Sequence, residues 1–542
     1  MLHPRRSSLW ALPLILACDP GPGPTPVAPE EEPPRVVEQV PGGLFVAEPC
    51  ADLYDPDVVP VFELDIQPED WAAIEADYAA GRKDYHPAVF RYGDEVVEDA
   101  QVRLKGNPGF SWFTEKMQFV IAFNEVNPDG RFHGQRKLAL DASWYEPTFL
   151  RDRVAWSIIR RQDVVPGACA NSAQLVINGE LYGLYTNIEF LDREWLERVF
   201  GDHHATGTLW KYGYDAVSNA EAALGLNDDF LSAYSPDELA ALGEVEEWLA
   251  AWALEIVVGS DDGYWCCNHN FYLYEHPARG LLFVPWDLDG SFDLQGYTTD
   301  PIEGYPNNLG LFEQRQFLRL VEDPVWGPKF LDALEDANTL LDPEIVLGEI
   351  DAWQAQLLPL IEADPTRSTG VKEHLETVER MRAWVPARHE FLKSWIACAR
   401  GEDTDGDGDG ATVCVDPHDG DPAIHPAAAE VCDGVDNDAD GWVDDHPDCE
   451  DCQTHELDGE VFLFCRWPRD NDAAQDNCAE SGGALSGPQG AEATLYFFYT
   501  WPVQEHWWIS GGSGGRCGTW NERSFTTSSD DCAVEHPSVC RL

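Results

Sequence analysis

Cysteine content is the strongest constraint on how this chain can fold. The 542 residues include 15 cysteines, more than a protein of this size usually carries in a reducing cytosol. Six of them lie between positions 452 and 542. Disulfides form only where Cα atoms approach to within about 7 Å, so each one limits the arrangement of the segments it joins. The chain is therefore expected to fold in an oxidising compartment.

The N-terminus indicates secretion. Arg5 and Arg6 precede a nine-residue apolar run, Leu9–Ala17, which is too short to span a bilayer. The run ends in Ile15-Leu16-Ala17-Cys18, which resembles a bacterial lipobox and implies a signal peptide over 1–18 with Cys18 as the lipidated residue. Ordinary cleavage after a small residue is the alternative. Lipidation would leave 14 cysteines, an even number suited to disulfides.

Composition narrows the function classes further. Residues 19–45 contain eight prolines between Asp19 and Pro41, which predicts an extended tether. Acids outnumber bases by 98 to 35, for a formal charge of −63. Such an excess argues against binding a phosphate backbone and favours hard cations such as Ca²⁺. The sequence has no apolar run of about 18 residues, so we expect membrane contact through the lipid only and no nucleic-acid partner.

Residues 46–400 predict one large α+β domain that begins strand-rich and ends helix-rich, which suggests two lobes. Asn178-Gly179, flanked by apolar runs, is a strong hairpin signal. The expected strands are 59–66, 88–92, 99–104, 116–123, 175–177, 184–188, 270–274 and 281–285. The expected helices are 68–78, 149–161 and 239–258, followed by an almost wholly helical stretch over 312–396.

Several motifs in this domain resemble the spore-coat CotH kinase family. They are Arg103-Leu104-Lys105-Gly106-Asn107, Lys116, GQRKLAL at 134–140, Leu150-Arg151, VINGELYGLY at 176–185 with Glu189, Leu209-Trp210-Lys211, and the block from Asp262 through NFYLY at 270–274 to PWDLD at 285–289. The resemblance covers about 350 residues in family order. It implies a two-lobed atypical protein-kinase-like fold that uses ATP with Mg²⁺ or Mn²⁺ to phosphorylate Ser or Thr of a protein substrate. The usual kinase Gly-rich loop and the H-R-D and D-F-G signatures are absent.

The acidic residues of the last motif block suit phosphoryl transfer. Asp287 and Asp289 lie two apart after a predicted strand, so an extended backbone would point both carboxylates the same way, as a metal-ligand pair. Asn270 could supply a further metal contact, and Asp262, eight residues earlier, is by resemblance the catalytic base. Asp261 is an alternative match for that base. Asp289 could instead cap the turn at Gly290-Ser291.

The sequence offers several candidates for the cation that binds the nucleotide phosphates. Lys116 is preferred, because it lies in a predicted strand after a glycine-containing loop, and Lys105 and Lys211 follow in that order. Arg151 and Arg153 could also reach phosphate. Glu189 ends the hairpin near the expected hinge, where an ATP-binding role and a structural ion pair are equally plausible.

Eight cysteines outside the last domain have no assigned pairing. Cys266 and Cys267 fall inside the expected catalytic loop, and adjacent cysteines do not pair easily, so Cys50, Cys169 and Cys398 are their candidate partners. The others are Cys414, Cys432 and Cys449.

Residues 402–451 form an acidic segment in which carboxylates alternate with glycine. Carboxylates at every second position match the first ligands of a Ca²⁺ loop. The expected calcium ligands are Asp403, Asp405, Asp407, Asp409, Asp433, Asp436, Asp438 and Asp440. The segment resembles metal-binding repeats of secreted bacterial proteins, with Ala439 where their pattern has Cys. A disordered acidic linker is the alternative.

Residues 452–542 contain six cysteines, which allow 15 pairings. The segment resembles a disulfide-rich α+β C-type-lectin-like domain, and that resemblance implies the pairs Cys452–Cys465, Cys478–Cys540 and Cys517–Cys532. The Glu-Pro-Asn and Gln-Pro-Asp tripeptides of calcium-dependent sugar sites are absent. A protein or another glycan is therefore the expected ligand.

Two functions follow from the sequence. The first is a secreted, lipid-anchored kinase at the bacterial cell envelope or outer surface, in which the Ca²⁺-binding and lectin-like segments present the kinase domain or recruit its target. The second is a catalytically inactive adhesion protein of the cell surface, favoured by the unusual cysteine pair in the catalytic loop.

Overall fold

The computed structural model describes residues 49–109, 111–112, 116–143, 146–292, 296–302, 315–431, 435 and 437–439, together with short elements between 452 and 541. The predicted signal peptide, Cys18 and the tether lie outside the described residues. No helix in the described part of the chain is both long and apolar enough to cross a membrane.

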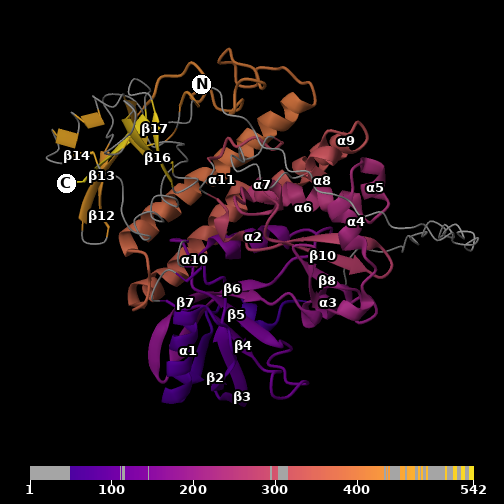
Figure 1. Cartoon of the computed structure of the whole chain (residues 1–542). Helices are drawn as coiled ribbons and strands as arrows, with labels where there is room; N and C mark the ends of the chain where they lie inside the picture. Colours follow the sequence, from indigo (N-terminus) through magenta and orange to yellow (C-terminus); the bar gives the residue numbers. More distant parts are fainter. Residues whose placement is uncertain are drawn as a thin grey trace, which may run out of the picture. The chain divides into compact units, whose positions relative to one another are not determined.

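The first lobe is a closed barrel of seven strands. The strands are β1 (Val61–Asp65), β2 (His86–Tyr92), β3 (Glu95–Leu104), β4 (Phe119–Ala122), β5 (Lys137–Asp141), β6 (Ala170–Ile177) and β7 (Glu180–Glu189), in the order β1-β2-β3-β4-β5-β7-β6. The parallel pairing of β1 with β6 closes the barrel, and all its other pairs are antiparallel. In Figure 1 these strands gather beside helix α1 (Pro68–Ala80).

Local sequence explains two features of the barrel. Asn178 and Gly179 both have positive φ, +52° and +81°, as the two-residue turn of a hairpin requires. A disulfide joins Cys50 to Cys169 and fixes the start of the domain beside the start of β6. Cys50 and Cys169 therefore pair with each other, and the prediction that they were partners for Cys266 or Cys267 is wrong.

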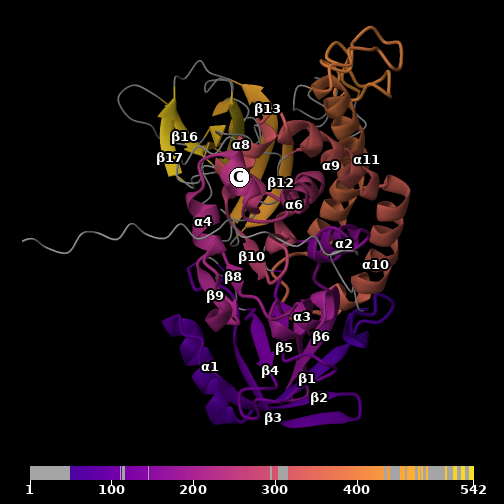
Figure 2. The same cartoon turned by 90° about the vertical axis from the view of Figure 1, so that its right-hand side faces the viewer.

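The second lobe combines a small sheet with helices. The sheet has the order β11-β10-β8-β9, formed by β8 (Leu209–Lys211), β9 (Asp215–Ser218), β10 (Phe271–His276) and β11 (Gly280–Pro285). The shorter helices are α2 (Arg151–Ile159), α3 (Arg193–Phe200), α4 (Leu226–Ser232), α5 (Pro236–Ala240), α7 (Tyr264–Cys267) and α8 (Arg315–Val321). The longer ones are α6 (Val245–Val258), α9 (Trp326–Leu340), α10 (Pro343–Ala363) and α11 (Val371–Ala399). Helices α10 and α11 run side by side in both views (Figures 1 and 2).

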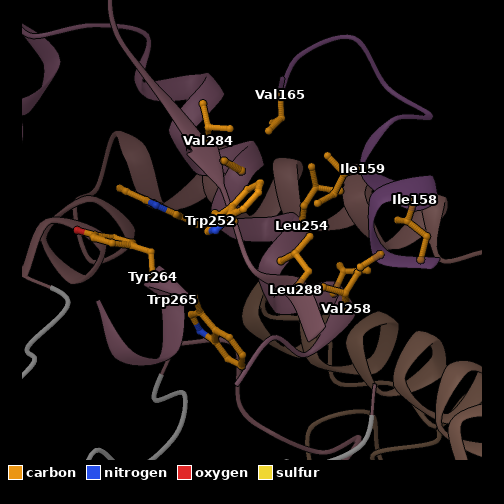
Figure 3. Close-up of a cluster of buried hydrophobic side chains, with 14 of the residues drawn as sticks. Ile158, Ile159, Val165, Trp252, Leu254, Val258, Tyr264, Trp265, Val284 and Leu288 are labelled. Carbon is orange, nitrogen blue, oxygen red and sulfur yellow. The ribbon is translucent and has the colours of Figure 1, made fainter. Parts of the chain in front are cut away.

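The core of the second lobe lies under the loops that follow α6 and β11. Trp252 and Val258 of α6 and Leu288 are fully buried, and all belong to one continuous hydrophobic cluster. Figure 3 shows Leu288 beside Val258, and Trp252 near Val284 of β11. Burial of each such side chain contributes about 1.5–3 kcal/mol. The loops that carry Asp262 and Asp287 therefore rest on a rigid base.

The expectation of a mixed α+β fold is confirmed, and most predicted elements are present within a few residues. The predicted stretch 239–258 forms two helices instead of one, because α5 ends at Ala240 and Gly243 packs against the backbone of Leu281. The closed barrel was not predicted, since closure depends on the pairing of β1 with β6, which are far apart in the sequence.

The segment after 452 contains a sheet in the order β12-β13-β18-β15-β16-β17, with β14 also on β18. These strands are β12 (Cys452–Leu457), β13 (Glu460–Arg469), β14 (Ala484–Leu485), β15 (Trp507–Trp508), β16 (Cys517–Asn521), β17 (Thr526–Asp530) and β18 (His536–Arg541). The register places Cys452 opposite Cys465, and Cys478 is disulfide-bonded. The predicted pairings themselves depend on side chains outside the described ones.

A buried ion pair links the barrel to the end of α10. The Nζ atom of Lys116 lies 2.8 Å from Oδ2 of Asp364 and 2.5 Å from the carbonyl oxygen of Leu184, and both charged side chains are fully buried. The same Asp364 oxygen accepts the backbone N–H of Leu184. Through these contacts, Lys116 links β7 to the end of α10 in the helical lobe.

Removing one partner of this pair is expected to destabilise the protein strongly. Asp364→Ala leaves the Lys116 ammonium buried without its counter-ion, which typically costs about 3–5 kcal/mol of unfolding free energy. Urea denaturation measures the effect. Glu376→Ala, which breaks the exposed Lys372–Glu376 pair, is the control and should change stability by less than about 1 kcal/mol. Equal effects of the two substitutions would show that the buried pair does not hold the lobes.

Candidate active site

Lys105 lies at the centre of a group of aspartates. It follows the last residue of β3, and its Nζ atom is 2.5 Å from Oδ2 of Asp141, the last residue of β5. Burial alone lowers the pKa of Lys105, but the nearby Asp141, Asp287 and Asp289 outweigh burial and raise it. The ends of two neighbouring barrel strands thus present a fixed, charged lysine toward the second lobe.

Asp287 and Asp289 reach this lysine through a turn, which corrects the predicted geometry. Strand β11 ends at Pro285, Asp287 has φ +59°, and Leu288–Gly290 form a 3₁₀ turn, so the two carboxylates are not aligned by an extended backbone. Burial raises the pKa of Asp287, and Lys105 opposes that shift. Burial and then Asp141 raise the pKa of Asp289 to about 7. The backbone N–H groups of Gly290 and of Asp289 itself oppose this rise.

Asp152 is a fourth acidic residue of the site, and the sequence analysis missed both it and Asp141. Asp152 lies in the first turn of α2, and its Oδ1 accepts the backbone N–H of Leu288 at 3.1 Å. Burial, followed by Asp287 and Asp141, raises its pKa well above the usual range. In the sequence, Asp152 follows Arg151 of the Leu150-Arg151 motif, and Arg151 was predicted to reach phosphate. An acidic residue next to this candidate cation was the sequence signal that could have identified Asp152.

The expected catalytic loop places Asp262 beside Asn270. The Asn270 Nδ2 donates to Oδ2 of Asp262 at 2.8 Å, and the Tyr212 hydroxyl donates to Oδ1 of Asn270 at 3.2 Å. His269 stacks on Tyr212 with ring centroids 4.9 Å apart, and its Nδ1 is 3.3 Å from Oδ1 of Asp262. The Asp262 side chain is 55% exposed, whereas Asn270 is buried. Asp262 is therefore available to an incoming substrate.

Four non-glycine residues of this site have left-handed backbones. Tyr212, Asn268, Asn270 and Asp287 have φ values of +55°, +51°, +46° and +59°. This conformation costs roughly 1–2 kcal/mol for residues other than glycine, and such residues concentrate at functional sites. Packing must hold them there, which agrees with the buried core beneath these loops.

The donor set fits a divalent cation. After burial, Asp287 and Asp141 raise the pKa of Asp152, and Asp141 raises the pKa values of Asp287 and Asp289, while Lys105 opposes all three shifts and Lys211 also opposes that of Asp287. Burial lowers the pKa of Lys211, and Asp287 counteracts that shift. No three of these carboxylates have oxygens within 4.8 Å of one another in the described part of the chain. Mg²⁺ is usually held by one or two carboxylates together with water and substrate phosphate, so this group could hold it only with a bound nucleotide.

Comparison with protein families agrees with this arrangement. The family described as "CotH kinase protein" matches residues 102–235 and 221–392, slightly more than half of the chain. The chain belongs to the CotH kinase family. A second family, described as "Putative metal-binding motif", matches residues 416–445. No curated protein matches the chain.

Two arginines that were predicted to reach phosphate make buried structural contacts in the CotH kinase domain. Arg151 is fully buried 3.6 Å from Glu146. Arg153 packs on the Trp353 ring at 4.2 Å and donates to Gln356. Both arginines are thus held in buried contacts, as Lys116 is held by Asp364.

Glu189 forms a structural ion pair, which was one of the two roles predicted for it from the sequence. Its carboxylate accepts two hydrogen bonds from Arg198, at 2.6 and 2.7 Å, and one from the backbone N–H of Cys169. Asp261 also has a local contact, since its backbone N–H donates to the Gly290 carbonyl. Asp262, whose carboxylate faces Asn270, is thus the better placed of the two candidate bases.

The cysteine of the catalytic loop is disulfide-bonded, but not as predicted. Cys398 pairs with Cys414, and Cys50 pairs with Cys169, so none of the three proposed partners is joined to Cys266. The side chain of Cys267 lies outside the described ones. Cys266 is fully buried, and its Sγ contacts the carbonyl oxygen of Asp261 at 2.5 Å.

The acidic segment gathers three of its predicted ligands. Asp405, Asp407 and Asp409 have carboxylate oxygens within 4.8 Å of one another, and Asp403 is not part of that group. The backbone N–H of Asp438 donates to Glu430, in a separate turn. Asp433, Asp436 and Asp440 lie outside the described residues. One predicted metal cluster is therefore assembled by the fold.

A buried glutamate of α6 supports the catalytic loop. The Oε2 of Glu255 accepts the backbone N–H of Trp265 at 2.8 Å, while its Oε1 has no hydrogen-bond partner. Burial raises the pKa of Glu255 to about 8. The protonated form is therefore the stable one in the folded CotH kinase domain near neutral pH.

This shift predicts a pH dependence of stability. Because the folded protein retains a proton that the unfolded chain releases at lower pH, stability should fall as pH rises from about 5 to 8. In Glu255→Gln, which is always neutral, the melting temperature should fall several degrees less over that interval than in the parent. Glu246→Gln, on the exposed side of the same helix, is the matched control and should keep the parent's profile. Identical profiles for all three proteins would contradict the role of Glu255.

Proposed function

We propose that the protein is a secreted, lipid-anchored kinase that transfers the terminal phosphoryl group of ATP to Ser or Thr residues of proteins. The observation that carries this proposal is the meeting of Asp262, Asn270 and Asp287 at one site with Lys105. The first two are joined by a 2.8 Å hydrogen bond, and Asp287 interacts electrostatically with both Asp262 and Lys105. Phosphoryl transfer depends mainly on such positioning and charge stabilisation.

Each residue has a chemical role in this proposal. Asp287 and Asn270 would hold Mg²⁺ or Mn²⁺, which supplies charge neutralisation at the phosphate oxygens. Asp262, exposed and hydrogen-bonded to Asn270, would orient the substrate hydroxyl and accept its proton. Lys105 would bind phosphate oxygens, with Lys211 as a second cation. Lys105 replaces Lys116 in this role, because Lys116 is buried against Asp364.

Asp141, Asp152 and Asp289 support these groups. Asp141 fixes the Lys105 ammonium through their ion pair, and Asp152 holds the turn after Asp287 through the Leu288 N–H. Asp289 caps that turn and adds negative charge that favours the metal. Truncating any of the three should act through position or charge and not through contact with the substrate.

The proposal places the kinase domain at the bacterial cell envelope, through lipidation of Cys18. The acidic segment would bind Ca²⁺ and act as a braced spacer. The domain over 452–542 would bind a glycan or a protein and so bring substrate to the kinase domain. If the kinase domain proves inactive, the same segments would define a cell-surface adhesion protein.

Label transfer from radiolabelled ATP tests the activity. The secreted chain, with Mg²⁺ or Mn²⁺, should phosphorylate itself or an added protein. Asp287→Asn and Asp262→Asn should reduce the rate by about 10²–10⁴-fold. Asp261→Asn is the matched control and should retain most activity. A complete absence of transfer, together with no nucleotide binding by calorimetry, would reject the kinase proposal in favour of the adhesion protein.

The choice of lysine has its own test. Lys105→Met should raise the KM for ATP or abolish transfer, and should also lower the melting temperature, because the ammonium of Lys105 neutralises the aspartates around it. Lys116→Met should mainly change stability, since its ammonium has no exposure. Kinetics and thermal unfolding of both variants separate the two roles. A loss of nucleotide binding confined to Lys116→Met would reverse the assignment.

A further inference from the structure

Residues 405–416 have the spacing of a complete one-ion calcium loop. Asp405, Asp407 and Asp409 occupy positions 1, 3 and 5 of this segment, Gly410 occupies position 6, and Asp416 occupies position 12. Calcium loops of twelve residues take carboxylates at 1, 3 and 5, require a glycine at 6, and close with a carboxylate at 12. Gly410 has φ +105°, which the sharp turn at that position demands.

The first three carboxylates are already turned toward a common point. Asp405 accepts the N–H groups of Gly408 and Gly410, which wraps the chain around its side chain. Asp407 and Asp409 each use Oδ1 to accept a backbone N–H two residues ahead. Their Oδ2 atoms are buried and have no hydrogen-bond partner. Buried anionic oxygens without a partner are costly, so they indicate a missing positive ligand.

Asp416 provides an independent observation of the same kind. Its side chain is 1% exposed, Oδ1 accepts the N–H of His418 at 2.7 Å, and Oδ2 has no partner. Burial raises its pKa, the hydrogen bond from the His418 N–H opposes that shift, and the charges of Asp409 and Asp407 add to it. Asp416 thus holds a buried anionic oxygen without a partner at position 12 of the loop, outside the group of three carboxylates whose oxygens lie within 4.8 Å of one another.

The segment is also tied to the kinase domain. The Cys398–Cys414 disulfide fastens position 10 of the loop to the end of α11. Beyond Asp416, His418 packs edge-on against Tyr297, with centroids 5.2 Å apart. The carbonyl of Tyr297 accepts a hydrogen bond from Arg388 of α11. Any ion that orders this loop therefore acts next to the segment that follows Asp289.

We propose that Asp405–Asp416 binds a single Ca²⁺ ion, that Asp416 is the ligand that closes the site, and that the ion fixes the loop against α11 and Tyr297. This proposal rests on the calcium binding proposed for the acidic segment, but not on kinase activity. The metal-binding family match begins at Asp416 and so does not include the other three carboxylates. Ca²⁺ fits better than Mg²⁺, because an all-oxygen loop with several carboxylates suits its larger, flexible coordination shell.

Calcium titration of the full secreted chain, after removal of metal with a chelator, tests the proposal. Calorimetry should show that Asp416→Asn weakens one binding event at least tenfold or removes it. Asp421→Asn has the same charge change at an exposed residue of the same segment, whose side chain accepts the Ala423 N–H, so it should bind within about threefold of the parent. Equal weakening by the two variants would overturn the role of Asp416.

Proteolysis and a second variant keep the result interpretable. Ca²⁺ should protect the stretch between Glu402 and Asp421 from cleavage in the parent and in Asp421→Asn, but not in Asp416→Asn. Asp409→Asn should lose the same binding event, and non-reducing mass spectrometry of each variant should still show the Cys398–Cys414 link. Calcium binding that survives Asp416→Asn would refute this inference alone. Failure of the parent to bind Ca²⁺ would refute the calcium part of the proposed function as well, and would leave the kinase assay unaffected.

Discussion

The balance between Lys105 and the buried aspartates around it governs the arrangement of the kinase domain. Asp141, Asp152, Asp287 and Asp289 come from β5, α2 and the turn after β11, and Lys105 comes from the end of β3. Repulsion among carboxylates in a low-dielectric setting is severe without a nearby cation. The barrel therefore has to place Lys105 next to the aspartates that α2 and the turn after β11 contribute. A divalent metal that carries the nucleotide would neutralise more of the negative charge of these aspartates.

The residues with left-handed backbones show that this site is conformationally strained and that packing stabilises it. Tyr212, Asn270 and Asp287 occupy backbone conformations that glycine would adopt more easily, yet their side chains are the ones that make the contacts of the site. Asn and Asp tolerate this region better than most residues, whereas Tyr212 requires packing to remain there. Its stacking on His269 and the buried core below supply that packing. Strain and function thus coincide at the same positions.

Much of the domain could be predicted from sequence because its signals are local. Asn178-Gly179 specifies a hairpin, and the apolar periodicity after 312 specifies helices. The family resemblance pointed to Asp262 and Asn270 as residues of one loop, and the structure joins them by a hydrogen bond. The sequence favoured Lys116 over Lys105 as the lysine that binds the nucleotide, and only the structure shows that Lys116 is fully buried against Asp364 while Lys105 is paired with Asp141. Asp141 and Asp152 were missed for the same reason, since each becomes part of the site only when distant elements meet.

Taken alone, the sequence determined the α+β character, the family motifs and the alternating carboxylates of the acidic segment, because each depends on residue type and short-range spacing. The tertiary structure decided which charges are buried together. It closed the barrel by pairing β1 with β6, paired Lys116 with Asp364, and brought Asp152 of α2 to the turn after β11. These outcomes depend on desolvation and on contacts between remote segments, which no local pattern encodes.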